Sequence, residues 1–169
     1  ANEFQIPHDF SSGPSKSNEL DDIREFLNQL QVKYLEWFLS SQRMKEYCQH
    51  RQLSESDQSI FSIGYGPKAQ EQIDWLQKNK NESVSMKSGL FKEDLYPLLT
   101  DRLIFPIHNS RGILVGFSGR TLDPENKAKY INSPESSVFS KKKLLYGLHL
   151  AKKKAKEMDR LIVVEGYMD

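Results

Sequence analysis

The sequence has few of the residues that build metal clusters and disulfide frameworks. Cys48 is the single cysteine among 169 residues, which excludes an intramolecular disulfide and a zinc site made of several thiolates. The four histidines, His8, His50, His108 and His149, lie far apart and show no metal-ligand spacing. A metal ion bound through this chain is therefore expected to use carboxylate ligands.

Long hydrophobic runs are also missing. No apolar run approaches the ~18 to 20 residues that span a bilayer, and residues 1–10 lack the basic start and apolar stretch of a signal peptide. An aromatic content of 11% argues against wholesale disorder. We therefore expect a cytosolic protein with no membrane partner, whose length fits one domain or a large piece of a bigger protein.

Charge is distributed unevenly along the chain, although the net charge is +1. Residues 101–160 hold 13 basic and 6 acidic side chains, a net charge of +7, and the nine residues that follow carry −2. A basic block followed by acidic residues suggests a polyanion-binding surface beside a carboxylate site. The alternative is a solvated lysine-rich helix, which a charge run taken alone favours.

Helical periodicity dominates the first half of the chain. Apolar residues recur at three- and four-residue intervals from Asn18 to Phe38 and predict a long amphipathic helix, which Asn18 or Asp21 could cap. The other elements expected there are a linker or unpacked terminus over 1–18, a helix over 41–50, a helix capped by Ser54 with Asp57, a strand over 61–67, a helix over 69–79 and a loop over 78–88.

A β-hairpin is the clearest local prediction. Two apolar strands over 102–107 and 113–118 are joined by a short loop that ends in Gly112. Pro106 has no N–H for a ladder, so its strand is expected to be an edge or to bulge there. Residues 121–140 show no helical period and are predicted to form an extended surface loop.

The C-terminal part of the chain combines a helix, a strand and two acids. Helical spacing returns over 142–159, and the β-branched run over 161–164 is typical of a buried parallel strand. Glu165 follows that run, and Asp169 comes four residues later. The carboxyl end of a strand is where an α/β sheet places its chemistry. Because the helix expected after such a strand is missing, we expect a truncated chain.

These features together suggest one kind of chemistry. Arg120 follows a glycine-flanked strand, a basic stretch runs from Lys127 to Lys143, and Glu165 and Asp169 supply carboxylates. In phosphoryl transfer to a nucleic acid, cations hold phosphates and carboxylates hold a divalent metal ion.

Short motifs occur along the chain. They are FPI at 105–107, GFSGR at 116–120, KYINSPE at 129–135, LYG at 145–147 and LIVVEGYMD at 161–169, preceded by weaker ones at 47–54 and 61–67. In order and spacing they resemble the motifs of the catalytic core of bacterial DnaG-type DNA primases. Residues 161–169 resemble the opening strand and acidic motif of the Toprim fold in its primase form. The resemblance covers the chain from about residue 20 to the end.

The resemblance implies roles for individual residues. Those matching positions that hold the template and the incoming nucleotide are Arg51, Arg120, Lys129, Tyr130, Asn132 and Lys141. Glu165 and Asp169 match the first Toprim acids, implied to be catalytic, with Glu165 as a metal ligand. The alternative interpretation of residues 132–134 is turn chemistry.

The implied fold is α+β. A helical part and a mixed β-sheet would form the N-terminal subdomain of the core over 19–145, and residues 146–169 would begin the Toprim subdomain. The implied activity is synthesis of short RNA primers on single-stranded DNA by a DNA-directed RNA polymerase, a nucleotidyltransferase. This chain would supply the basic binding surface and the first Toprim acid, and is expected to be inactive alone.

Cofactors and partners follow from the same resemblance. The implied metal is Mg²⁺ or Mn²⁺, with zinc in a separate N-terminal module that this chain lacks. Implied partners are single-stranded DNA, ribonucleoside triphosphates, the RNA–DNA primer duplex and a replicative helicase reached through a missing C-terminal domain. The implied location is the bacterial cytoplasm, at the replication fork.

Two residues depart from the family pattern, and two other classes of protein remain as alternatives. Ser118 stands where the family usually has glycine, which narrows backbone freedom there, and Gln52 replaces the glycine after Arg51. A Toprim nuclease or recombination factor would lack a downstream Asp-x-Asp in primase spacing and would cleave. A non-catalytic nucleic-acid-binding module would keep its function after Glu165→Gln.

Overall fold

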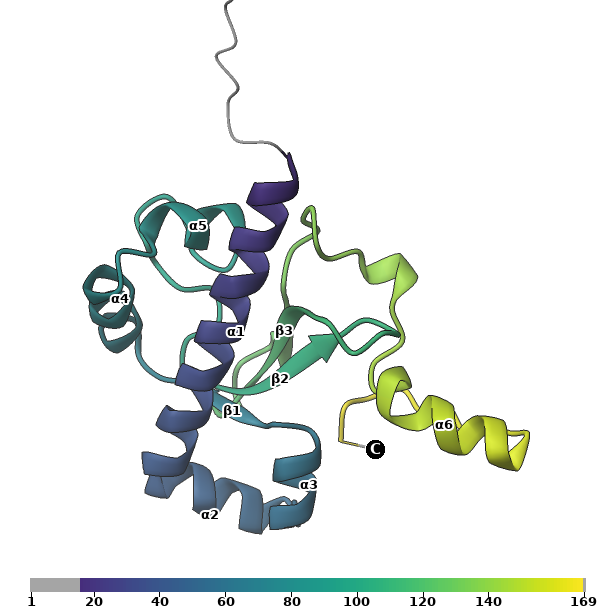
Figure 1. Cartoon of the computed structure of the whole chain (residues 1–169). Helices are drawn as coiled ribbons and strands as arrows, with labels where there is room; N and C mark the ends of the chain where they lie inside the picture. Colours follow the sequence, from purple (N-terminus) through teal and green to yellow (C-terminus); the bar gives the residue numbers. More distant parts are fainter. Residues whose placement is uncertain (1–15, 169) are drawn as a thin grey trace, which may run out of the picture.

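A long helix lies across a four-stranded sheet in the computed structural model, which describes residues 16–168 (Figure 1). α1 (Lys16–Ser40) confirms the predicted amphipathic helix. It begins before Asn18, so Asn18 and Asp21 lie inside the helix and do not cap it. The linker predicted over residues 1–18 falls outside the described residues, except for its last three, which begin α1.

Shorter helices surround this centre. They are α2 (Gln42–His50), α3 (Glu55–Ile60), α4 (Ala69–Lys78), α5 (Glu82–Lys87), the 3₁₀ helix η1 (Lys141–Lys143) and α6 (Leu148–Met158). Ser54 and Asp57 form the capping box that the sequence predicted for α3. None of the helices within residues 16–168 has the length and apolar character needed to cross a lipid bilayer.

α5 contradicts the loop predicted over 78–88. Its six residues are mostly polar and too few to show a helical period. Tertiary contacts stabilise it instead, because Ser85 is buried, Val84 packs against the apolar cluster that includes α1, and Lys87 pairs with Glu19 of α1 at 3.3 Å.

The sheet is built on the predicted hairpin and is antiparallel in all three pairings. β1 (Gly64–Gly66), β2 (Arg102–His108), β3 (Leu114–Thr121) and β4 (Tyr130–Asn132) lie in the order β1-β2-β3-β4. Pro106 lies beyond the part of β2 that pairs with β1 and just before a register shift at Ile107 and His108, as predicted for a strand proline. The α+β class is confirmed, but the sheet expected to be mixed is antiparallel throughout residues 16–168, because each strand pairs with the next one along the chain.

β4 corrects the prediction that residues 121–140 are loop throughout. A three-residue strand cannot show the alternating pattern by which a longer strand is identified. Its end is fixed by Ser133, whose buried hydroxyl accepts from Phe117 N at 2.8 Å and donates to Phe117 O at 3.1 Å. Gly116 makes room for this contact, because a Cβ there would lie 2.8 Å from Ser133 Oγ.

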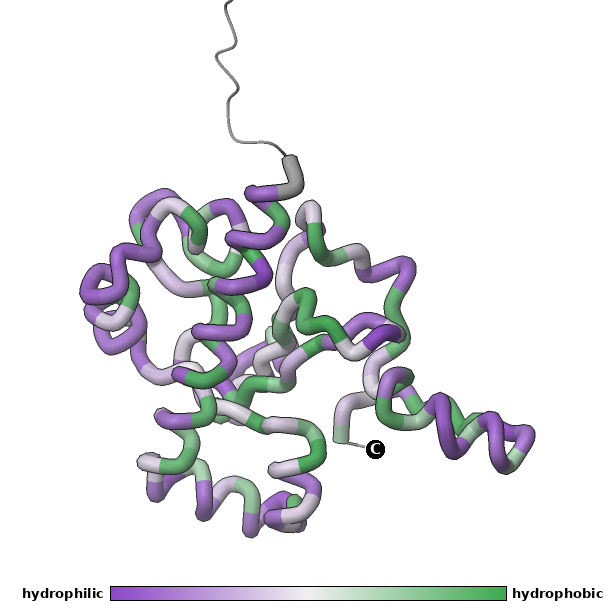
Figure 2. The backbone as a smooth tube through the Cα atoms, viewed as in Figure 1, coloured by the Kyte–Doolittle hydropathy of each residue, from purple (hydrophilic) through white to green (hydrophobic). Residues whose placement is uncertain are grey.

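Two apolar clusters use the two faces of the sheet, whose central strands are hydrophobic (Figure 2). On one face α1 covers the sheet, and the rings of Tyr34 and Phe117 meet edge to face at 5.2 Å. On the other face Leu103 and Phe105 pack with Met44 of α2. Full burial of such side chains contributes about 1.5–3 kcal/mol each.

The structure accounts for both departures from the family pattern. Ser118 of β3 pairs with Phe105 of β2, and its φ is not in the positive range that favours glycine, so serine brings no backbone strain there. Gln52 has φ of 56°, a left-handed conformation that favours glycine. It ends α2 in a Schellman motif, in which Leu53 N donates to Cys48 O at 2.9 Å.

The structure differs from the prediction at two points between Lys141 and Val164. α6 begins at Leu148 and not near Lys142, because Gly147 has φ of 73° and separates it from η1. Residues 161–164 form no strand and lie exposed, with Ile162 at 83% exposure. A strand needs a neighbour for its backbone hydrogen bonds, and within residues 16–168 none pairs with this run.

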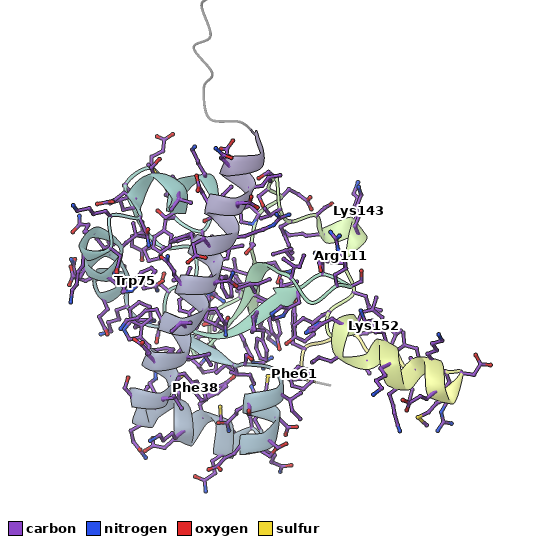
Figure 3. All side chains as sticks on the ribbon, viewed as in Figure 1. Phe38, Phe61, Trp75, Arg111, Lys143 and Lys152 are labelled. Carbon is purple, nitrogen blue, oxygen red and sulfur yellow. The ribbon has the colours of Figure 1, made fainter. Side chains whose placement is uncertain are left out.

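α6 meets the β2–β3 hairpin through its first turns. The rings of His149 and His108 lie 4.6 Å apart, and Lys152 Nζ donates to Ser110 O at 2.8 Å. Figure 3 shows Lys152 near Arg111 of the hairpin tip.

This contact is predicted to weaken in acid. Burial lowers the pKa of His108 and of His149 from the ordinary value of 6.5. The neighbouring His149 lowers the pKa of His108 further, and the charge of Lys152 lowers that of His149 further. Histidines freed from the contact bind protons more readily, so the docked state loses stability as the pH falls below about 6.5. Amide hydrogen exchange over 148–158, corrected for its intrinsic pH dependence, should be faster at about pH 5 than at about pH 7.5. Equal protection at both values would contradict this prediction.

Candidate nucleic-acid and nucleotide interface

The sheet brings three of the predicted binding residues to one face. Arg120 pairs with Tyr130, and Ser118 pairs with Asn132 across β3 and β4. Phe105 of β2 lies opposite Ser118 on the other side of β3. Side chains at facing positions share a face, so Arg120, Tyr130 and Asn132 lie on the face that packs with α2.

Arg120 is held between two tyrosines. Its Nε donates to the Tyr47 hydroxyl at 3.0 Å, and its Nη1 donates to the Tyr130 hydroxyl at 2.6 Å. The guanidinium also lies 5.0 Å from the centre of the Tyr130 ring, a cation–π geometry. Burial lowers the pKa of Arg120, but the hydrogen bonds to Tyr130 and Tyr47 raise it by more. A fixed positive charge therefore stands at the end of β3.

Tyr47 extends this arrangement to Arg51, whose guanidinium lies 5.7 Å from the Tyr47 ring centre. We call Arg51, Tyr47, Arg120 and Tyr130 the Arg–Tyr row; it joins the end of α2 to β3 and β4. Tyr47 was not predicted as a site residue. The sequence could have indicated it, because Tyr47 lies on the helix predicted over 41–50 and four residues before Arg51, a spacing at which helical side chains are neighbours.

The two predicted lysines stand apart from the row. Lys129 precedes β4 and Lys141 begins η1, and both side chains are exposed. Within residues 16–168 neither ammonium group forms a hydrogen bond or ion pair, whereas the Lys141 backbone N–H donates to Glu135 at 2.8 Å. Both charges are thus accessible to an anionic ligand.

The acidic segment reaches the same face through Tyr167. The Tyr167 hydroxyl donates to Asn132 Oδ1 at 3.1 Å, and its ring lies 5.3 Å from that of Tyr130. Glu165 is exposed, and Asp169 lies outside the described residues. Within residues 16–168 no group of three or more His, Cys, Asp or Glu could hold a metal ion. The Glu165 carboxylate has the oxygen chemistry that Mg²⁺ prefers, but a full coordination shell needs further ligands.

Arg102 is a positioning residue that the sequence did not reveal. It is 5% exposed, and its Nη1 donates to Gly119 O at 3.1 Å and to Ala128 O at 3.0 Å. Burial lowers the pKa of Arg102, and Asp101 opposes that effect. The side chain passes beneath Gly119, where a Cβ would lie 2.9 Å from Arg102 Cδ. It thereby fixes the chain entering β4, which carries Lys129 and Tyr130.

Arg102→Lys is predicted to lower the free energy of unfolding by about 1–3 kcal/mol, because the shorter lysine does not reach the position of Nη1 and its ammonium group is more strongly hydrated than a guanidinium. Denaturant unfolding would measure the change. Arg111→Lys, at the exposed hairpin tip, is the matched control and should stay within about 0.5 kcal/mol of the wild type. Equal free energies of unfolding in the two variants would show that the Arg102 contacts do not stabilise the fold.

Comparison with known proteins identifies the family. The profile of the DNA primase catalytic core, N-terminal domain, matches residues 25–152. The DNA primase of Legionella pneumophila is 34% identical over 169 residues, covering 98% of this chain and 29% of that protein. The DNA primase of Helicobacter pylori strain J99 is 35% identical, covering 100% of this chain and 30% of that protein.

Solved structures agree. The Aquifex aeolicus primase, comprising its zinc-binding and RNA polymerase domains, superposes with a TM-score of 0.82 at 28% identity, over 97% of this chain and 40% of that chain. A DnaG primase catalytic domain bound to single-stranded DNA gives 0.80 at 29% identity, over 90% and 52%. The chain belongs to the bacterial DnaG-type DNA primase family. It spans about three-tenths of the length of the two curated relatives.

Proposed function

We propose that this chain is the template- and nucleotide-binding part of a primase that synthesises short RNA primers on single-stranded DNA. The observation that carries the proposal is the Arg–Tyr row, which lies on the same sheet face as Asn132 and the segment that bears Glu165. A row of fixed cations beside a carboxylate suits nucleotidyl transfer, in which phosphates are held while a divalent ion is bound nearby.

Each side chain has a role that its chemistry supports. Arg51 and Arg120 present planar guanidinium groups that match phosphate oxygens, while Lys129 and Lys141 supply accessible point charges. Tyr130 offers an aromatic surface on which Arg120 is already placed. The relative solved with single-stranded DNA supports such DNA as a partner. Ribonucleoside triphosphates and the RNA–DNA primer duplex would be further ligands of the same cations.

Glu165 and Asp169 would bind Mg²⁺ or Mn²⁺ together with carboxylates from further residues. A divalent ion bound there would favour attack of a ribose 3′-hydroxyl on the nucleoside triphosphate. Zinc belongs to a separate module in this proposal, as the zinc-binding domain of the A. aeolicus primase suggests, because this chain has a single cysteine. A replicative helicase would bind a further domain of the complete protein, at the replication fork in the bacterial cytoplasm.

Residues 19–145 would form the N-terminal subdomain of the catalytic core, and residues 146–169 would begin the Toprim subdomain. The exposed run 161–164 supports this division, because it lines an open apolar groove of about 700 Å³ with Phe61 and Leu145. An exposed apolar surface of this kind is normally covered by another part of a protein. A sheet that continued from this segment would pair the run as a strand.

Primer synthesis by the complete protein tests the proposal. On single-stranded DNA with Mg²⁺ and ribonucleotides, Arg120→Ala and Glu165→Gln should each lower synthesis by about 100-fold or more, because each removes charge that stabilises the transition state. Arg111→Ala is the control and should retain synthesis.

Two results would contradict the proposal. Synthesis that survives Glu165→Gln would favour a non-catalytic binding module. Cleavage of DNA in place of primer synthesis would favour a Toprim nuclease.

A further inference from the structure

Tyr167 holds the acidic segment on the binding face, where Met168 packs against the same apolar cluster. Its ring stacks on Phe105 with centroids 5.4 Å apart and 25° between planes, and it meets the Tyr146 ring edge-on at 4.5 Å. Phe105 is buried on β2, opposite Ser118 of β3. Tyr167 therefore packs on the sheet through Phe105 and on the segment before α6 through Tyr146.

The Tyr167 hydroxyl determines how the Asn132 amide is used. It donates to Oδ1 of Asn132 at 3.1 Å. A side-chain amide has one carbonyl oxygen that accepts and one NH₂ group that donates two hydrogen bonds. Because Oδ1 is directed at the phenol, the amide is oriented with Nδ2 toward a ligand. Such a group recognises oxygen acceptors, which phosphate and ribose supply.

We propose that Tyr167 is a positioning residue that orients the Asn132 amide toward an oxygen of the incoming nucleotide and holds the Glu165 segment beside Arg120. The inference rests on the proposed function and adds a residue to it. Tyr167 lies two positions after Glu165 and contacts Tyr130, the residue that also holds Arg120. One side chain thus connects the nucleotide-binding groups with the acid.

Titration of the ¹⁵N-labelled chain with ATP tests this role, because NMR reports both the affinity and the Asn132 side-chain amide resonances. Tyr167→Phe keeps the ring contacts and removes the hydroxyl. It should weaken ATP binding about five- to tenfold, the effect of one lost hydrogen bond, and should reduce the ATP-induced shift of the Asn132 NH₂ signals. Tyr146→Phe removes a hydroxyl from the tyrosine packed against Tyr167 and should bind ATP like the wild type.

A tyrosine that served packing alone would give a different result. Phenylalanine fills the same space, so wild-type affinity and an unchanged Asn132 shift in Tyr167→Phe would overturn the inference. Asn132→Asp provides a second route that leaves Tyr167 in place. It keeps an oxygen for the phenol but replaces the donor with a negative oxygen, and should weaken ATP binding about tenfold or more. Unchanged affinity in this variant would also overturn the inference.

The same titration separates failure of the inference from failure of the proposed function. If Arg120→Ala abolishes binding while Tyr167→Phe behaves as the wild type, the role of Tyr167 alone is wrong. If Arg120→Ala binds ATP as tightly as the wild type, or if the wild-type chain binds none, the proposed function fails and the inference fails with it.

Discussion

The register between β2, β3 and β4 is the constraint on which the candidate site depends. It places Arg120 opposite Tyr130 and Ser118 opposite Asn132, so that their side chains share one face. A slip of one residue in β4 would turn both of its candidate binding residues, Tyr130 and Asn132, toward α1. Two contacts prevent such a slip. Ser133 bonds to Phe117 at one end of β4, and Arg102 bonds to Ala128 O before the other end.

The basic charge of residues 101–160 serves several purposes, so neither of its two initial interpretations describes all of it. Arg102 is buried and supports the backbone, and Arg120 is fixed within the Arg–Tyr row. The lysines of α6 fit the solvated-helix interpretation better, since all four are exposed, although Lys152 also bonds to Ser110 O of the hairpin. Geometry, and not the density of charge, therefore distinguishes the candidate binding surface.

Sequence patterns predicted those parts of the fold whose signal is local. The period of α1, the Ser54–Asp57 cap and the two apolar runs of the hairpin all lie within short windows. β4 and α5 were missed because they are short and form through tertiary contacts. The strand predicted over 161–164 requires a pairing partner, which a local pattern cannot supply. Arg102 could not be recognised because its partners are backbone carbonyls of distant residues. The candidate binding residues came from motifs, whereas the structure alone showed how Tyr47 and Tyr167 join them.

Mapping of the surface that binds single-stranded DNA would test the central claim most directly. Amide chemical shifts of the ¹⁵N-labelled chain, followed during titration with a short oligodeoxynucleotide, should change around Tyr47, Arg51, Arg120, Tyr130 and Asn132. Such a result would show that one sheet face organises the interface. Changes confined to the lysines of α6 would contradict it, because binding would then follow charge density and not the register of the sheet.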